Sequence, residues 1–303
     1  MLAQAVESYL SVRRAAGFEL QSQGGFLRSF VRFSEAKGKD YVCSETAIEW
    51  AGSPPTVFQR ARRLSMVIRF ARYMRAEDQR HEIPPAIFGS ATRPRSVPFI
   101  FSSDDIQHIV RTASQLGCRD SFQGQTYSTL FALVACTGLR ISEALRLRFD
   151  DITTDGLIIR CSKFRKSRLV PLHQTTQAAL ERYLQRRRPY APLEDHLFVS
   201  TSRRPLQPLS ARVAFSIVVK KIGLPRGPGL PRPTIHALRH SFAVRALETC
   251  PDSRDHITKH MLALSTYLGH TAVGYTYWYL EATADLMRNI AVTSERFVIG
   301  GRS

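Results

Sequence analysis

Three short stretches of the chain hold residues that could act on a phosphate group. The first is Arg140, which follows Thr137-Gly138, where a glycine can end one helix and let the backbone approach a ligand. An arginine at such a bend can present its planar guanidinium to a phosphate through two hydrogen bonds. The alternative is an ordinary surface ion pair between Arg140 and Glu143, three residues further on.

The second stretch is His236-Ala237-Leu238-Arg239-His240. His236 and Arg239 are three positions apart and therefore share one face of a helix. The arginine supplies a fixed positive charge, and a histidine can act as acid, base or hydrogen-bond donor near neutral pH. The proline-rich loop upstream predicts that both stand in the exposed first turn of the helix, which itself attracts anions. The alternative is a solvated pair at a capped helix start, and His240 is expected to be structural.

The third stretch is Leu268-Gly269-His270, which an aromatic cluster follows. The cluster consists of Tyr275, Tyr277, Trp278 and Tyr279. Aromatic core packing accounts for most of these side chains. A single tyrosine hydroxyl close to two arginines would differ, because the positive field would stabilise its phenolate, which could then attack phosphorus. The residue types alone do not say which tyrosine this is.

The charge of the chain indicates a polyanionic partner. The 303 residues include 43 Lys and Arg against 25 Asp and Glu, a formal net charge of +18. Both parts of the chain are basic, with +6 through Arg95 and +12 beyond it. Such an excess repels itself in the folded state and is tolerable when a polyanion neutralises it. Nucleic acid is the leading candidate, and an anionic membrane surface is a weaker one because the basic residues do not gather on one apolar-faced helix.

Other bulk features narrow the class of protein. The five cysteines, an odd and scattered set without a CxxC pair, argue against a disulfide framework and a zinc cluster; they are Cys43, Cys118, Cys136, Cys161 and Cys250. No apolar run approaches the roughly 20 residues that span a bilayer. The first residues lack the basic and apolar regions of a secretory signal, so we expect an intracellular protein without a membrane partner.

Residues 1–90 have a helical pattern. Its clearest helix runs from about Thr56 to Ala76, with Pro54-Pro55 before it and Thr56 as a possible cap. Apolar residues at steps of three or four predict one buried stripe, made of Val57, Ala61, Leu64, Ile68, Ala71 and Met74. Six arginines occupy other positions of this helix: Arg60, Arg62, Arg63, Arg69, Arg72 and Arg75. Such a face is often merely solvated, but so many arginines with so few acids favour contact with a DNA backbone.

Prolines and glycines between His81 and Pro98 indicate a linker between two domains. Beyond it, Ser102-Ser103-Asp104-Asp105 has the pattern of a capped helix start. Residues 157–161 and 168–172 are β-like around a basic turn and predict a small hairpin. The helices expected in this part lie at about 126–136, 175–187, 210–222, 236–247 and 259–268. The fold class predicted is mainly α with a small antiparallel β-sheet.

These motifs, taken together and in order, resemble the tyrosine recombinase or phage integrase family. The resemblance rests on Thr-Gly-Leu-Arg-Ile-Ser-Glu-Ala-Leu, a lysine in a hairpin ending Arg-Leu-Val-Pro-Leu, His-Ala-Leu-Arg-His-Ser-Phe-Ala, and Leu-Gly-His with a later tyrosine. It covers roughly residues 96–290. It implies a helical DNA core-binding domain over residues 1–90, a linker over 91–98, and an α+β catalytic domain over 99–303.

The resemblance also implies roles for individual residues. Arg140 and Arg239 match the two catalytic arginines, and His236 belongs to the His-x-x-Arg pair. Lys163 matches the hairpin lysine, although Phe164 stands where the family commonly has glycine, which leaves Lys166 as an alternative. His270 matches the late His/Trp position. Tyr279 matches the nucleophile, because it lies nine residues after His270 and three after Thr276 as in the family pattern. Arg165 and Lys166, in the same basic turn, are expected to contact DNA.

The mechanism implied needs neither a metal nor another cofactor. Tyr279 would form a 3′-phosphotyrosine and Lys163 would protonate the departing 5′-oxygen. Accordingly the sequence has no Gly-x4-Gly-Lys-Ser/Thr loop and no clustered carboxylates for magnesium. The expected partner is double-stranded DNA with recombination sites, on which the protein is expected to form a homotetramer. Accessory recombinases are further candidate partners. The expected location is the cytoplasm of a prokaryote, in association with the nucleoid.

Two other functions remain open from the sequence. One is a type IB topoisomerase-like enzyme with the same chemistry but no exchange of partners. The other is a DNA-binding accessory factor without activity, which the presence of every expected active-site residue type argues against.

A last pattern concerns the C-terminus, where residues 282–294 predict a short helix with an apolar stripe of Leu286, Met287, Ile290 and Ala291. The family resemblance implies that this segment is exchanged between subunits; packing on its own catalytic domain is the alternative.

Overall fold

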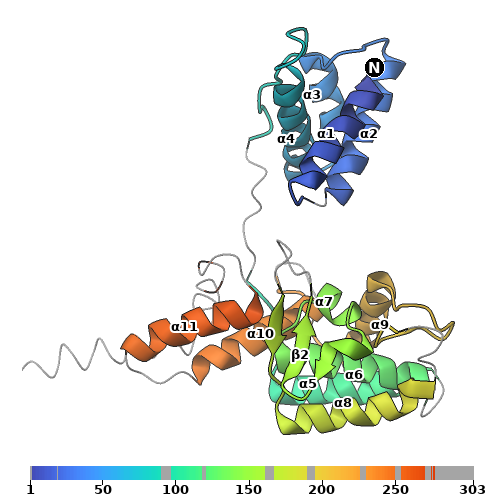
Figure 1. Ribbon diagram of the computed structural model, residues 1–303, viewed down its shortest axis with the longest axis vertical. Helices are drawn as coiled ribbons and strands as arrows, with labels where there is room; N and C mark the ends of the chain where they lie inside the picture. The colour runs from blue at the N-terminus through green and yellow to red at the C-terminus, as the bar shows by residue number, and fades with distance from the viewer. Residues whose placement is uncertain are drawn as a thin grey trace, which may run out of the picture. The chain divides into compact units, whose positions relative to one another are not determined.

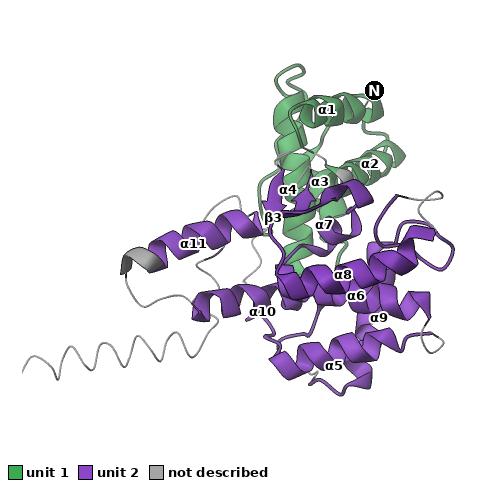
Figure 2. Cartoon of the chain, turned by 60° about the horizontal axis from the view of Figure 1, so that its bottom comes forward, with its two compact units in different colours: residues 1–95 green, residues 96–303 purple. Residues whose placement is uncertain are grey.

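The chain forms two compact units, residues 1–95 and 96–303, in a computed structural model (Figure 2). The structure describes residues 2–18, 20–89, 97–117, 121–160, 167–189, 195–225, 230–249, 254–269, 274 and 276. The division between the units falls within the stretch predicted as a linker, whose residues 90–96 lie outside the described part. The mainly helical fold class with a small antiparallel sheet is confirmed.

Unit 1, within its described residues, is a bundle of four helices (Figure 1). Its helices are α1 (Leu2–Ala15), α2 (Gln21–Ala36), α3 (Ser44–Gly52) and α4 (Val57–Met74). Aromatic side chains fill the space between them. The rings of Phe30 and Trp50 meet edge to face with centroids 5.5 Å apart, and those of Tyr9 and Phe70 do so at 5.6 Å. This bundle therefore has a hydrophobic core of its own.

Helix α4 begins as the sequence predicts, but its buried face is shifted. The Thr56 hydroxyl accepts a hydrogen bond from the Gln59 amide at 3.3 Å, which confirms the cap. Val57 is 62% exposed and Ile68 only half-buried, whereas Val67 and Phe70 are fully buried. The predicted stripe was wrong at Val57 and Ile68. An apolar residue in the first turn lies beyond the neighbouring helices, so periodicity alone overextends the stripe.

Unit 2 is built around α6 (Phe122–Thr137), a helix buried on most of its sides. Helices α5 (Ser103–Ser114), α8 (Gln174–Arg187) and α10 (Ile235–Glu248) pack against it (Figure 1). Helix α9 (Pro208–Lys221) packs on α5. The predicted capping box is present at α5, where Ser102 and Asp105 exchange side-chain and backbone hydrogen bonds. The result is one large apolar core that holds the ends of α6 and α10 in place.

The sheet of unit 2 contains one strand more than the predicted hairpin. Strands β1 (Ile152–Thr153), β2 (Gly156–Ile159) and β3 (Arg168–Val170) pair antiparallel in that order, after the short 3-10 helix η1 (Phe149–Asp151). Leu157 lies opposite Val170, and Ile159 lies opposite Arg168. The turn between β2 and β3 lies mostly in residues 161–166, outside the described part.

Two further helices complete the surroundings of the predicted site. Helix α7 (Ile141–Leu145) follows α6 directly, and α11 (Arg254–Leu268) packs on α10 and β3. Val244 and Leu247 of α10 form a small apolar cluster with Met261 and Leu264 of α11. This cluster fixes the C-terminal end of α11 beside the start of α7 and the strand β3.

Candidate active site

Arg140 stands at the corner between α6 and α7. Gly138 ends α6 with a φ of 61°, a left-handed conformation that glycine adopts without strain. A Cβ atom at this position would lie 2.5 Å from Cδ1 of Phe242, so a side chain is excluded by space as well. The prediction that Gly138 ends one helix is confirmed. The tight corner brings Arg140, the N-terminal cap of α7, close to the backbone of α6.

Arg140 is bound to a buried carboxylate rather than to a surface partner. Its Nη1 donates to Oε1 of Glu143 at 2.7 Å, and its backbone amide donates to Oε2 at 3.0 Å. Glu143 is only 8% exposed, whereas the Arg140 side chain is 30% exposed. The ordinary surface pair considered from the sequence is therefore excluded. Arg146, on the same short helix, is exposed.

A second arginine, Arg168 at the start of β3, completes the neutralisation of Glu143. Its Nη1 and Nη2 donate to the two carboxylate oxygens at 3.1 and 2.8 Å. Burial by itself would raise the pKa of Glu143, but the hydrogen bond and charge of Arg168, together with the amide and charge of Arg140, lower it to about 2. The carboxylate is thus ionised at every physiological pH. The sequence analysis did not single out Arg168.

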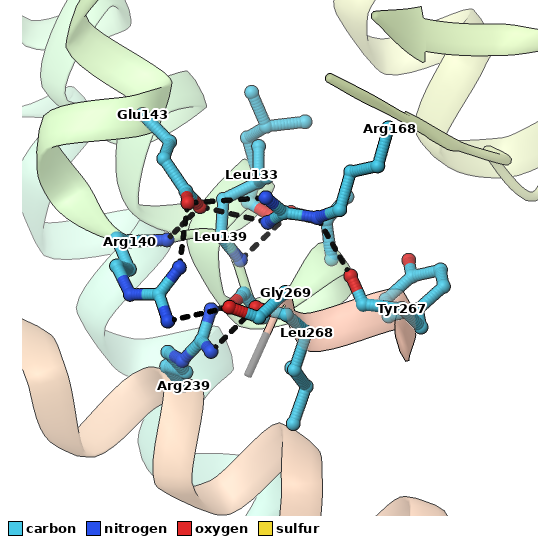
Figure 3. A network of polar contacts seen from close by, with 11 residues as sticks. Leu133, Leu139, Arg140, Glu143, Arg168, Arg239, Tyr267, Leu268 and Gly269 are labelled. Atoms are coloured by element: carbon cyan, nitrogen blue, oxygen red, sulfur yellow. Dashed lines mark hydrogen bonds and ion pairs between the residues drawn. The ribbon is translucent and has the colours of Figure 1, made fainter. Parts of the chain in front are cut away.

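Arg239 lies in the interior beside the same corner. It is 1% exposed, and its Nη1 donates to the carbonyl oxygen of Gly138 at 2.6 Å. Its Nη2 donates to the carbonyl of Leu268 at 2.7 Å, at the end of α11. Arg140 Nη2 donates to the next carbonyl, that of Gly269, at 3.0 Å. Residues far apart in the sequence therefore meet at the C-terminal end of α11 (Figure 3).

His236 stands in the first turn of α10, as the sequence predicts. The Thr234 hydroxyl caps this helix by accepting from the amide of Ala237 at 3.3 Å. Displacement of water by packed atoms lowers the pKa of His236, and the positive charges of Arg239 and Arg140 lower it further. His236 is consequently neutral at physiological pH and lies within the field of both arginines.

His240 is closer to the site than the sequence analysis expected. Its ring meets the ring of His236 edge to face, with centroids 4.3 Å apart. Residues four apart share one face of a helix, which explains the contact. Three predicted residues of the site are thus together: Arg140, His236 and Arg239. The other three, Lys163, His270 and Tyr279, lie outside the described residues, as do Arg165 and Lys166 of the basic turn.

The six arginines of α4 fall into two groups. Arg60 donates through Nε to the carbonyl of Pro54 at 2.7 Å, and Arg63 donates to Ser53 Oγ at 2.7 Å and stacks on the Trp50 ring at 4.9 Å. Both are partly buried. The other four, Arg62, Arg69, Arg72 and Arg75, are exposed. The structure thus divides a set that the sequence presents as uniform.

The described residues contain no metal-binding cluster, no membrane-spanning helix and no disulfide. No group of three or more His, Cys, Asp or Glu side chains in that part of the chain could hold a metal ion. No helix there is both long and apolar enough to cross a membrane. Of the cysteines, Cys43 and Cys136 are described, and both are free thiols.

Comparison with known proteins agrees with the fold. A protein of Sinorhizobium fredii named integrase/recombinase y4rB is 35% identical over 303 residues, which cover 97% of this chain and 96% of that protein. The tyrosine recombinase XerD of Caulobacter vibrioides is 29% identical over 80% of this chain and 75% of its own length. The solved structure of a lambda integrase tetramer bound to a Holliday junction shares the fold, with a TM-score of 0.59 and 17% identity over 89% of this chain and 77% of that one.

These findings define the class of protein first. The fold and the relatives are those of tyrosine-type recombinases, so the chain is an enzyme that breaks and rejoins DNA. The sequence profile of the phage integrase family matches residues 100–285. The chain belongs to the phage integrase family.

Proposed function

We propose that this protein is a site-specific recombinase that cleaves and rejoins DNA strands through a 3′-phosphotyrosine formed by Tyr279. The observation that supports this most is the convergence of Arg140 and Arg239 on the carbonyls of Gly269 and Leu268. These carbonyls directly precede His270 in the sequence, and Tyr279 follows nine residues later. The two arginines are therefore held against the segment that leads into the proposed nucleophile.

The proposed reaction consists of two balanced displacements at phosphorus. The Tyr279 hydroxyl gives its proton to His236 or His270, and its oxygen forms a bond to the scissile phosphorus. The bond to the 5′-oxygen breaks, and Lys163 supplies the proton that the departing oxygen takes up. Arg140 and Arg239 stabilise charge on the non-bridging oxygens as the transition state forms. His236 and His270 hydrogen-bond those oxygens or carry a proton. The 5′-hydroxyl of a partner strand then reverses the first step, and no ATP or metal ion is required.

Access to the phosphate requires a change at the end of α11. Arg239 is buried, and both of its Nη atoms donate to backbone carbonyls. Arg140 shares its guanidinium between Glu143 and the carbonyl of Gly269. A phosphate must replace or join these carbonyls as acceptor. Because Arg239 is buried and bonded to the carbonyl of Leu268, a phosphate reaches it only if the backbone at the end of α11 shifts. Without DNA, Arg140 and Arg239 are therefore held close together, but backbone carbonyls occupy part of their hydrogen-bonding capacity.

The units have separate tasks in this proposal. Residues 1–90 form the core-binding domain, and the exposed arginines of α4 contact the DNA backbone. Residues 99–303 form the catalytic domain, whose C-terminal segment passes to a neighbouring subunit of a homotetramer on DNA. The lambda integrase tetramer on a Holliday junction, which shares the fold, supports this assembly. The biological role is integration, excision or transposition of a mobile element, or resolution of DNA multimers, with or without an accessory recombinase.

The decisive experiment is the trapping of covalent protein–DNA adducts on nicked substrates from the ends of the native genetic element. We expect wild-type protein to form adducts in excess chelator, and Tyr279→Phe to bind the same DNA without forming any. Tyr275→Phe and Tyr277→Phe are the matched controls, and both should retain adduct formation. Adducts from Tyr279→Phe would move the nucleophile to another tyrosine. A wild-type protein that binds its site but forms no adduct would leave only a DNA-binding function.

A further inference from the structure

Arg168 occupies an inward position that a charged residue rarely takes. Side chains alternate along β3: Leu169 is 46% exposed, whereas Val170 is fully buried and Arg168 shares its side of the strand. The Arg168 side chain is 11% exposed. Besides its two bonds to Glu143, its Nε donates to the carbonyl of Tyr267 at 2.8 Å. One guanidinium therefore joins the strand, the carboxylate of α7 and the last turn of α11 (Figure 3).

A second observation comes from Gly269. Its φ is 64°, and a Cβ built on it would lie 2.7 Å from Nη1 and 2.9 Å from Cζ of Arg168. The guanidinium thus lies so close to this backbone that a side chain at position 269 would require Arg168 to shift. This close approach to Gly269 links Arg168 to the segment before His270. The contact is independent of the ion pair between Arg168 and Glu143.

The three arginines divide the available acceptors in a definite way. Carbonyls of the consecutive residues Tyr267, Leu268 and Gly269 accept from Arg168, Arg239 and Arg140 in that order. Glu143 is faced by the two charged groups Arg140 and Arg168. If Arg168 were absent, Arg140 would be the one charged group left beside the buried carboxylate. Glu143 would then neutralise the charge of Arg140 more fully. Because Arg168 also binds Glu143, the carboxylate cancels less of the positive field of Arg140.

From this geometry we propose that Arg168 is a positioning residue for strand cleavage: by holding Glu143 in a two-pronged ion pair, it orients Arg140 and preserves that arginine's charge for the scissile phosphate. The inference rests on the proposed function of Arg140. Arg168 itself touches no reacting atom. It acts through Glu143, and its bond to Tyr267 keeps the end of α11 in register with the two arginines.

The test is single-turnover cleavage of a nicked substrate at saturating protein, with thermal unfolding and DNA affinity measured in parallel. Arg168→Gln should cleave about ten-fold or more slowly, by analogy with loss of outer partners of catalytic ligands, while DNA affinity changes little. Arg168→Lys keeps the charge without the two-pronged geometry and should be intermediate. The matched control is Arg188→Gln, because Arg188 forms an exposed ion pair with Glu181 in the same unit. It should cleave like wild type.

Two readouts separate positioning from mere stability. Glu143→Gln combined with Arg168→Gln should be about as slow as Glu143→Gln alone, because both changes remove the same route to Arg140. In Arg168→Gln the pKa of Glu143 rises, and a protonated Glu143 no longer holds Arg140 in place. The ratio of variant to wild-type rate should therefore fall as the pH is lowered toward about 5. Arg168→Lys should not show this additional loss of rate at low pH. If Arg168→Gln does not fold, the rate of Arg168→Lys is the measurement that tests the proposal.

Each outcome decides the matter. Wild-type rates in folded Arg168→Gln or Arg168→Lys would overturn the inference and leave the proposed function intact. Losses that multiply in the double variant would do the same, since Arg168 and Glu143 would then act independently. Failure of wild-type protein to form any adduct would instead remove the proposed function on which the inference rests.

Discussion

Glu143 is the carboxylate that two of the three clustered arginines share. It is buried, it accepts from two guanidinium groups and one amide, and its pKa is held at about 2. A buried charge of this kind is stable only while its partners remain in place. The stability of unit 2 therefore depends on pH, and it falls as Glu143 becomes protonated.

The pH dependence of unfolding tests this account of Glu143. The folded pKa lies below the ordinary value of 4.5, so the carboxylate contributes stability that is fully present above the ordinary pKa and is lost as the pH falls toward 2. We expect wild type to exceed Glu143→Gln in free energy of unfolding by about 3 kcal/mol more at pH 7 than near pH 2. Urea unfolding at a series of pH values measures the difference.

The control for this measurement is Asp195→Asn. Asp195 pairs with Arg148 at the surface, where both side chains are 54% exposed, and such pairs contribute little. Its removal should leave the pH profile almost unchanged. Parallel pH profiles for wild type and Glu143→Gln would show that the carboxylate is not held ionised by the fold.

At the scale of elements, α4 combines two kinds of arginine on one helix. Arg60 and Arg63 turn back to their own bundle, where they donate to backbone and side-chain oxygens. Arg62, Arg69 and Arg72 are exposed. Arg62 keeps one contact with the bundle, its guanidinium lying 5.6 Å from the centre of the Phe26 ring. The exposed group can meet a phosphate backbone more readily than Arg60 and Arg63, which would first have to give up their hydrogen bonds.

Salt dependence of DNA binding tests the exposed face of α4. Replacing Arg62, Arg69 and Arg72 by Gln should weaken binding and flatten the plot of log affinity against log salt by about one unit per lost phosphate contact. Arg28→Gln with Arg80→Gln is the matched control, because these exposed arginines already pair with Glu7 and Asp78. An unchanged salt slope in the α4 variant would show that this face is solvated and does not contact DNA.

The elements also show where sequence patterns suffice. Turn and cap residues act locally, so the sequence alone is enough to assign Thr56, Ser102 and Gly138. Burial is decided by neighbours, and for that reason Val57 was expected inside and Val67 was missed. Arg168 was missed because its partner is contributed by α7, although an arginine among the apolar residues of a strand already indicates a buried partner. The choice of Tyr279 rests on family spacing, and it stays a prediction.

At the scale of the whole molecule, each unit has a separate hydrophobic core, and residues 1–95 and 96–303 form distinct compact bodies. Both parts are basic. A chain organised in this way can hold DNA with two independent surfaces, which suits an enzyme that must keep its grip while strands change partners. The assembly of several subunits then requires a further contact.

Truncation after Arg288 tests whether the C-terminal segment supplies that contact. The apolar stripe of Leu286, Met287, Ile290 and Ala291 lies outside the described residues and needs a partner surface, since large apolar side chains left in water forgo roughly 1.5–3 kcal/mol each. We expect binding to single sites to persist while synapsis and strand exchange are lost. Removal of Gly300 to Ser303 alone is the control and should leave exchange intact. Normal recombination by the longer truncation, or its unfolding in the absence of DNA, would contradict subunit exchange.

The convergence of three arginines on the end of α11 also bears on synthesis of the protein. The bonds from Arg140, Arg168 and Arg239 to that end span 129, 99 and 29 positions of the chain. The N-terminal unit can fold while the remainder is still being translated, but the arginines cannot gather until the ribosome has released residues 267–269. Under the proposed function, a nascent chain can bind the chromosome through its first unit without being able to cut it. The order of translation itself thus delays the hazardous activity until the enzyme is whole.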